Sequence, residues 1–374
     1  MNHFLVYFII LKLLLVAFHA FFFHFYFHLN IYSFLIIFFI NTLFTVRIAY
    51  KKIFHVKILT FIIELLSFIW FSWNTFAPFL LLIAIMIDKI IFNNQQFITS
   101  IFFLYSIIII IKSIYILFNP KFYINIINVN TKKGLAEQSS LKIVIISDLH
   151  INQLTTVKFI NKLSNEINKQ NPDLIFIVGD MFSMQPKYAP KIINKLKEIS
   201  HKNNIIVVSG NSDYTTGINE IKNFYQQTLK WIYLSNNMHF LPSYNVTIYG
   251  AEDPYYDKFF NRSSLNIISS CLKSTLNKKT INILLYHRNN TVYLNKFKLI
   301  DYQFSGHAHG GHYWPSTLIN KILKIRYVKG LFHINQNQSM YVTQGCGYST
   351  LPIHRLGTKT EITVLNLKAN HKNP

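Results

Sequence analysis

Five short apolar runs between residues 141 and 306 are each followed by Asp, His or Asn. The runs are 141–147, 173–179, 204–210, 281–286 and 302–306, and the polar residues after them are Asp148, His150, Asp180, Asn211, Asp213, His287, His307 and His309. Amphipathic stretches at 155–169 and 189–200 separate the first three runs, which predicts a sheet with helices on its faces. The later runs have short connections, which predicts a mixed sheet or two stacked sheets. Strand ends form the ligand-binding edge of such a sheet, so these polar side chains would meet there.

Each of these polar residues alone is weak evidence for a site, because a Gly-Asp pair is common in turns and a buried histidine is most often a hydrogen-bonded core residue. Five strand ends that each carry such residues are harder to explain as turns. At four of these strand ends the first polar residue follows a small residue: Ser147, Gly179, Gly210 or Gly306. A mixed set of Asp, His and Asn suits Mn²⁺, Fe or Zn²⁺ better than Ca²⁺, which prefers oxygen ligands. Two neighbouring metal ions need a bridging carboxylate, and Asp180, central in the order, is the natural bridge.

The series resembles the signature of the calcineurin-like metallophosphoesterases. That signature is D-x-H, G-D, G-N-H-D/E, a lone His and G-H-x-H, and this chain has Asp148-Leu149-His150, Gly179-Asp180, Gly210-Asn211-Ser212-Asp213, His287 and Gly306-His307-Ala308-His309. Three further segments resemble the membrane-associated bacterial branch of the family: GAEDP at 250–254, LLYHRNN at 284–290 and VTQGCGYSTLPIHRLGTKTEITVL at 342–365. The resemblance implies a four-layer α/β/β/α sandwich.

The resemblance also implies two divalent metal ions, with Mn²⁺ expected and Fe or Zn²⁺ as alternatives. By motif, Asp148, His150 and His309 would hold the first metal, Asn211, His287 and His307 the second, and Asp180 would bridge them. Asp180, Asn211 and His287 would also act in catalysis, while Asp213 would orient a ligand or its loop. His312 would be structural or support the metal ligands. The expected reaction is hydrolysis of a phosphodiester or pyrophosphate bond by a metal-bound hydroxide.

One residue departs from the family pattern. Ser212 stands where the family usually has a histidine that assists the leaving oxygen. A serine hydroxyl cannot act as a general acid near neutral pH. One interpretation is loss of activity, although every metal ligand is present. The other is a leaving group that needs no proton, such as a nucleoside monophosphate, and this favours a pyrophosphate or an activated diester as the substrate.

The net charge of +22 agrees with an anionic phosphorylated substrate, although a composition biased towards Lys, Asn and Ile would also produce it. Some relatives hydrolyse UDP-2,3-diacylglucosamine in lipid A biosynthesis, so a lipid-linked nucleotide is one expected substrate. Another nucleotide or a phospholipid is an alternative, and so is a metal-binding membrane scaffold or sensor with weak turnover. No nucleic acid partner is expected, because no basic, aromatic-rich strand is present. Arg288 and Arg355 are candidates for phosphate contacts or for structural roles.

The first third of the chain is predicted to be a membrane region. Residues 1–118 contain seven Lys or Arg and two Asp or Glu. Long apolar runs at 4–28, 31–46, 58–87 and 97–118 predict about four transmembrane helices. The third run contains Asn74 and Pro78 and could form two passes, which would give five. A signal peptide is the alternative for the first run, but it lacks a small-residue cleavage site.

The placement of Lys and Arg predicts the orientation. Basic residues occur at 47–57 and 121–133, which four spans would place on the same side of the membrane. We therefore expect a multi-pass protein of the bacterial inner membrane, in contact with its lipids, with a cytoplasmic catalytic domain. The two cysteines, Cys271 and Cys346, fit a reducing compartment. The expected boundaries are transmembrane helices at 1–118, a linker at 119–140 and the phosphoesterase domain at 141–374, with further strands at 245–250, 340–345 and 361–367 and further helices at 217–229 and 263–275.

Overall fold

The computed structural model describes residues 57–92, 94–131, 133–135, 140–199, 204–312, 316–348, 355 and 357–369. The described residues divide into a helical unit, 57–117, and an α/β unit that begins at Phe118. The first two predicted membrane runs, 4–28 and 31–46, lie outside the described residues.

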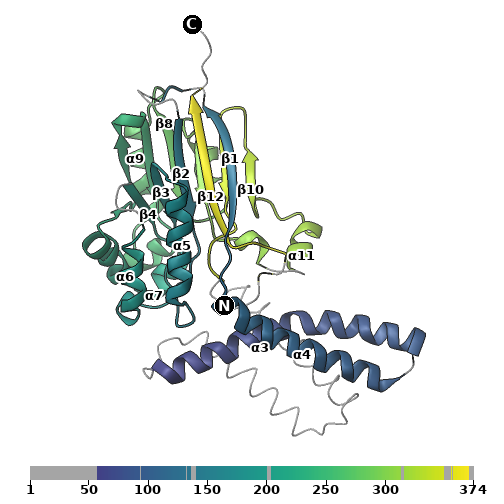
Figure 1. Ribbon diagram of the computed structural model, residues 1–374. Helices are drawn as coiled ribbons and strands as arrows, with labels where there is room; N and C mark the ends of the chain where they lie inside the picture. Colours follow the sequence, from purple (N-terminus) through teal and green to yellow (C-terminus); the bar gives the residue numbers. More distant parts are fainter. Residues whose placement is uncertain are drawn as a thin grey trace. The chain divides into compact units, whose positions relative to one another are not determined.

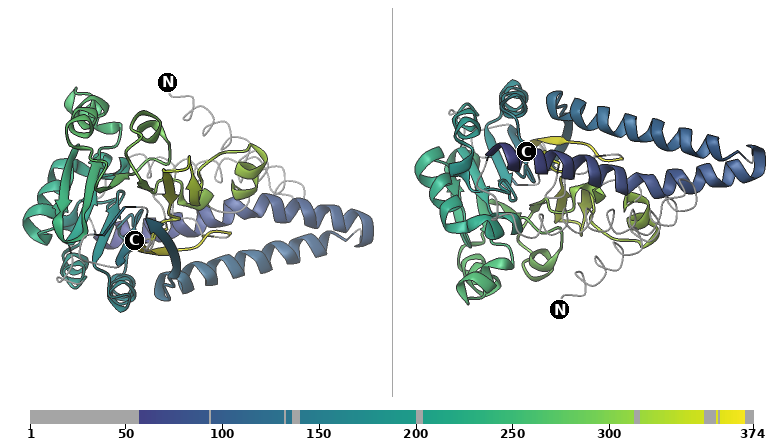
Figure 2. Two further views of the ribbon diagram at one scale, coloured as in Figure 1. Left: turned by 90° about the horizontal axis from the view of Figure 1, so that it is seen from above. Right: turned by 90° about the horizontal axis from the view of Figure 1, so that it is seen from below.

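The helical unit contains a hairpin of two long helices. They are α3 (Lys57–Ile87) and α4 (Gln95–Phe118), and the short π-helix η1 (Asp88–Phe92) follows α3. Figure 2 shows the two helices side by side. The Trp73 indole N–H donates a hydrogen bond to Ser106 Oγ (3.0 Å), and the Tyr105 hydroxyl donates to the Trp73 carbonyl (2.9 Å), so polar groups pair between the helices. Since α3 continues through position 78, the third apolar run forms one helix and not two.

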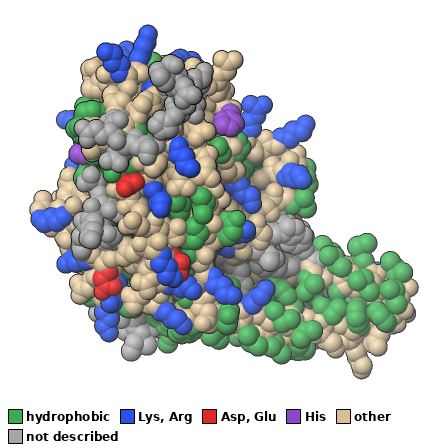
Figure 3. Space-filling view, turned by 45° about the horizontal axis from the view of Figure 1, so that its top comes forward, with side chains coloured by type: hydrophobic (Ala, Val, Ile, Leu, Met, Phe, Trp, Pro, Cys, Tyr) green, Lys and Arg blue, Asp and Glu red, His purple; other side chains and the backbone are tan. Residues whose placement is uncertain are grey.

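The described residues do not support four membrane spans. One helix among them, Gln96–Phe118, is long and apolar enough to cross a membrane, judged by length and composition. Large apolar side chains are nevertheless exposed along both helices, for example Leu66, Leu82, Leu104 and Ile111. Figure 3 shows hydrophobic side chains gathered on this hairpin.

The α/β unit contains two six-stranded sheets. The first has the order β1 (Tyr123–Thr131), β12 (Glu361–Ala369), β2 (Ser140–Ile146), β3 (Leu174–Val178), β4 (Asn204–Val208), β5 (Ile232–Tyr233). The second has the order β10 (Gly330–His333), β11 (Ser339–Val342), β9 (Tyr302–Ser305), β8 (Ile281–Tyr286), β7 (Val246–Ala251), β6 (Asn237–Leu241). Both sheets are mixed, because β12 runs antiparallel to β2, and β6 and β10 run antiparallel to their neighbours. The prediction was a mixed sheet or two stacked sheets, and the structure has two sheets that are both mixed.

Alternate residues of each central strand enter different cores. In β2, Val144 and Ile146 pack with the helices α5 (Val157–Lys169), α6 (Pro190–Leu196) and α7 (Asn211–Asn223), whereas Ile143 and Ile145 pack against the second sheet. A third core lies between the second sheet and the helices α9 (Ser264–Thr275) and α10 (Val292–Lys296). Three cores separate four layers, helix, sheet, sheet and helix, as Figure 1 shows.

Helix α5 illustrates how the sequence sets these layers. The Thr156 side chain accepts a hydrogen bond from the Phe159 N–H and caps the start of the helix. The face predicted from the 3.6-residue period, Phe159, Ile160, Leu163 and Ile167, is buried against the first sheet.

The predicted linker, 119–140, is wrong in its first part. Residues 123–131 form β1, which pairs in parallel with β12. β1 is an edge strand whose side chains are mostly exposed or half-buried, so its Asn-rich sequence carries little apolar signal. The predicted helix at 217–229 corresponds to the second part of α7 and the π-helix η3 (Phe224–Leu229) after it, because the backbone of α7 is non-helical at Gly217 (φ 130°). The first part of α7, which starts at Asn211 directly after β4 and Gly210, was not predicted.

Candidate metal centre

The polar residues that follow the strands meet at one edge of the sandwich. Strands β2, β3 and β4 are parallel neighbours, and so are β8 and β9, so their carboxyl ends point the same way within each sheet. A hydrogen bond joins the two sheets at this edge: the His307 backbone N–H donates to the Asp148 carboxylate oxygen Oδ1 (3.1 Å). The ends of β2 and β9 therefore meet at this edge.

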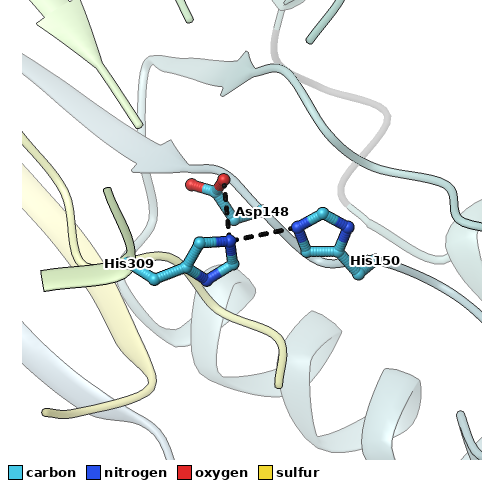
Figure 4. Close-up of side chains that lie close together, drawn as sticks. All are labelled: Asp148, His150 and His309. Carbon is cyan, nitrogen blue, oxygen red and sulfur yellow. Dashed lines mark hydrogen bonds and ion pairs between the residues drawn. The ribbon is translucent and has the colours of Figure 1, made fainter. Parts of the chain in front are cut away.

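Asp148, His150 and His309 form the first group of possible metal ligands. Their side chains converge in Figure 4. His309 Nε2 lies 3.1 Å from His150 Nε2 and 3.4 Å from Asp148 Oδ1. All three residues are buried, so this cluster of nitrogen and oxygen lone pairs lies away from bulk water.

Asp180, His287 and His307 form the second group. The carboxylate of Asp180 also reaches the first group, since its Oδ2 lies 3.4 Å from His287 Nε2 and 3.6 Å from His150 Nε2. Asp180 is therefore the residue placed between the two groups.

Two buried atoms of the site have no hydrogen-bond partner within the described part of the chain. The Nδ1 of His287 lies 2.8 Å from the Val178 carbonyl, and its Nε2 is directed at the Asp180 carboxylate, 3.4 Å away, without a hydrogen bond. The Oδ1 of Asn211, at the start of α7, is the second such atom. A buried polar atom without a hydrogen bond costs free energy, and a divalent cation beside it would remove that cost. The donor set therefore fits a metal ion.

The electrostatics of the site also favour a bound cation. Burial raises the pKa of Asp148 to about 6. Burial favours the neutral form of His287, but the carboxylates of Asp180 and Asp148 outweigh it and raise the pKa of His287 to about 10. Without a metal, the buried carboxylates thus draw a proton onto a predicted ligand. A divalent cation would replace that proton.

The backbone at the site is unusual. Five predicted ligands have left-handed backbone angles, with φ between 47° and 68°: Asp148, His150, Asp180, His307 and His309. Such φ values are uncommon for residues other than glycine and cluster at functional sites. The small residues before the ligands permit close approach, because a Cβ on Gly179 would lie 2.6 Å from His287 Nδ1 and one on Gly306 would lie 2.5 Å from Asp148 Oδ2.

Residues 141–311 match the sequence profile of the family described as calcineurin-like phosphoesterases. These residues form a calcineurin-like metallophosphoesterase domain. The resemblance seen in the sequence motifs is confirmed. Domains of this family use divalent metals, and the two groups of possible ligands agree with that.

Three relatives illustrate the similarity. A metallophosphoesterase of Campylobacter jejuni is 30% identical over 62% of this chain and 60% of its own length. A transmembrane protein with a metallophosphoesterase domain from Danio rerio is 24% identical over 62% of this chain and 54% of its own. A UDP-2,3-diacylglucosamine pyrophosphatase of Chlamydia trachomatis is 23% identical over 59% of this chain and 82% of its own. The chain spans about 60% of the length of the first relatives it matches.

Asp213 lies behind the metallophosphoesterase site. One of its oxygens accepts hydrogen bonds from the N–H groups of Asp180 and Gly210, both at 2.9 Å, and the other accepts from the Phe182 N–H at 3.1 Å. Both oxygens hold the loops after β3 and β4 together. The His312 ring stacks on His309 with centroids 4.8 Å apart, next to the first group.

The sequence analysis assigned no role to two acidic residues of the domain, Glu252 and Asp253. Glu252 is buried and accepts hydrogen bonds from the hydroxyls of Tyr214 and Tyr233, both at 2.6 Å. Asp253 is also buried and forms a two-point ion pair with Arg288 (2.5 and 3.2 Å). Both acids directly follow β7. A search for polar residues after the predicted strand at 245–250, as made for the other strands, would therefore have found them.

Two arginines contact ring nitrogens of predicted ligands. Arg288 Nη1 lies 2.7 Å from His307 Nε2, and Arg355 Nη2 lies 3.0 Å from His309 Nδ1. Each guanidinium therefore lies beside one of the two groups and adds positive charge next to its carboxylate.

Proposed function

We propose that this protein is a metal-dependent hydrolase of phosphodiester or pyrophosphate bonds. The observation that carries the proposal is the position of Asp180 Oδ2, 3.6 Å from His150 and 3.4 Å from His287, one residue of each ligand group. A carboxylate in this position can bridge two cations. Relatives named metallophosphoesterases and a pyrophosphatase support the same reaction class.

In this proposal Asp148, His150 and His309 hold one cation, and Asn211, His287 and His307 hold the other. Two divalent cations at these positions would polarise the phosphoryl group and lower the pKa of a water molecule. The mixed nitrogen and oxygen donors suit Mn²⁺, with Fe and Zn²⁺ as alternatives.

The chain itself orients these ligands and adds charge. The Val178 carbonyl fixes the His287 ring, and Asp213 fixes the two loops that carry Asp180 and Asn211. The Arg288 guanidinium, held by Asp253, can stabilise negative charge that develops on a phosphoryl group.

The proposed substrate is a pyrophosphate, with a lipid-linked nucleotide as the specific candidate. Ser212 supports this choice because its side chain cannot protonate a leaving oxygen. The similarity to a UDP-2,3-diacylglucosamine pyrophosphatase supports a nucleotide lipid as the substrate and lipid A biosynthesis as the role. A metal-binding scaffold or sensor with weak turnover is the alternative.

We also propose attachment to the bacterial inner membrane through the apolar helix α4, with the phosphoesterase domain on the cytoplasmic side. The exposed apolar side chains of α3 and α4 and a relative named as a transmembrane protein support this attachment. The basic residues at 121–133, directly after α4, support the orientation.

The test uses the purified full chain in detergent with Mn²⁺. UMP release from UDP-2,3-diacylglucosamine and hydrolysis of bis-p-nitrophenyl phosphate are measured. Asp180→Asn removes the bridging charge at constant size and should abolish both reactions. Glu198→Gln removes one exposed carboxylate on the surface beyond α6 and should change neither. A wild-type protein that binds metal but hydrolyses neither substrate would favour the scaffold or sensor instead.

A further inference from the structure

The connection from β9 to β10 exposes an unusual apolar surface. It contains helix α11 (Ser316–Ile322) and the turn that follows. Leu318, Ile322, Leu323 and Ile325 are 46, 67, 65 and 51% exposed. We call these residues, with the exposed Lys321, Lys324 and Arg326 among them, the α11 surface. Figure 1 shows α11 below β10.

The α11 surface is held in place at both ends. A Cβ on Gly311 would lie 3.0 Å from Asn320 Nδ2 and 3.4 Å from Val328 Cγ1, so both flanks pack on the loop that carries His309. The Asn289 amide also donates a hydrogen bond to the Tyr327 carbonyl (2.8 Å). Between these anchors, the Ile325 N–H donates to the Asn320 carbonyl (2.9 Å). The exposed residues are thus presented by a defined turn next to the candidate metal centre.

The charge of this region indicates the kind of partner. No Asp or Glu occurs between Asp301 and Glu361, whereas Lys321, Lys324, Arg326 and Lys329 are exposed. Apolar side chains interleaved with Lys and Arg are typical of segments that lie in the interface of a bilayer, where the cations meet anionic headgroups. A nucleic acid would satisfy the cations but would leave the large apolar side chains in water.

We propose that the α11 surface docks on a bilayer that contains anionic phospholipid. The four apolar side chains enter the interface, and Lys321, Lys324 and Arg326 contact the lipid phosphates. Membrane docking goes beyond the proposed hydrolysis, and its test measures no catalysis. The docking proposal and the hydrolase proposal can therefore fail independently.

The experiment uses the full chain reconstituted in vesicles. Ile322→Cys in a Cys271→Ser background is labelled with an environment-sensitive fluorophore. Vesicles contain phosphatidylcholine alone or phosphatidylcholine with phosphatidylglycerol. We expect a blue shift, loss of quenching by aqueous iodide and gain of quenching by doxyl lipid in the second mixture. High salt should weaken these changes, because it screens the cations.

Charge-reversal variants distinguish a specific surface from general basicity. Lys321→Glu with Lys324→Glu should remove the blue shift in anionic vesicles. Lys273→Glu with Lys278→Glu makes the same change of charge at exposed positions in and after α9 and should leave it intact. A label that stays open to iodide in both lipid mixtures would overturn the proposal. Protection by an added oligonucleotide but not by anionic lipid would overturn it in favour of a nucleic acid partner.

Discussion

Ser212 donates two hydrogen bonds to Asp180, one from its backbone N–H to Oδ1 (2.7 Å) and one from its hydroxyl to Oδ2 (3.0 Å). The hydroxyl therefore supports the carboxylate that lies between the two ligand groups. It is not positioned as a free group for a leaving oxygen. The departure from the family pattern thus has a structural consequence at the proposed bridge.

Ser212→His should distinguish the proposed substrates. Turnover of a pyrophosphate should change little, because a leaving nucleoside monophosphate needs no proton. Turnover of an alkyl diester should rise by about 10²-fold or more, the range of general acid catalysis. Ser212→Ala measures the loss of the hydroxyl contact with Asp180 alone. A large gain of kcat on the pyrophosphate would contradict the proposed leaving group.

Gly306→Ala should weaken the first metal group. The added Cβ would lie 2.5 Å from Asp148 Oδ2, which would have to move. We expect metal affinity to fall by about 10- to 100-fold, as when a supporting contact of a ligand is lost. Metal content after dialysis measures it. Gly134→Ala is the matched control, since a Cβ there meets no described atom within 4 Å. Equal metal content in both variants would contradict the close packing at Gly306.

The eight strands predicted from apolar runs are all interior strands of the two sheets. The four that were not predicted, β1, β5, β6 and β10, are the edge strands. An interior strand is covered on both faces and by both neighbours, so its sequence is a nearly continuous apolar run. An edge strand is partly exposed and can contain polar residues, such as Asn125 and Asn128 in β1, which interrupt the apolar run by which a strand is predicted.

The candidate metal centre was predicted more fully than the groups that support it. The ligand types follow strand ends directly, which a sequence displays. The supporting contacts join segments far apart in the chain, such as Arg288 with Asp253 or His287 with the Val178 carbonyl. The left-handed φ of residues such as Asp148 has only a weak signal in the residue type, because Asp and His adopt it more often than most other residues but still rarely. Both features depend on tertiary structure.

Removal of metal by a chelator should make stability fall between pH 6.5 and pH 10. Burial opposes the charged form of His287, but the carboxylates of Asp180 and Asp148 outweigh it and raise its pKa from 6.5 to about 10. The folded protein then binds a proton that the unfolded chain lacks, so this stabilisation is full below pH 6.5 and is lost as pH rises through 10. Thermal unfolding across this range measures the effect.

The metal-loaded protein should behave in the opposite way. Cations compete with protons for the same ligands, so metal binding strengthens as pH rises. His287→Gln should remove the dependence of the chelated protein on pH in this window. Parallel pH profiles with and without chelator would contradict the proposed exchange of a proton for a metal ion.

Arg288 and Asp253 should be strongly coupled in stability. The Asp253 side chain is fully buried, whereas that of Arg288 is 24% exposed. Arg288→Gln leaves a buried carboxylate without its cation and should lower the free energy of unfolding by about 3 kcal/mol or more. Asp253→Asn should cost less, because the guanidinium can turn towards water. The double variant should cost less than the sum of the single variants, as measured by denaturant unfolding. If the costs of the two single variants add up in the double variant, the two residues are not coupled, and the ion pair does not hold Arg288 beside His307.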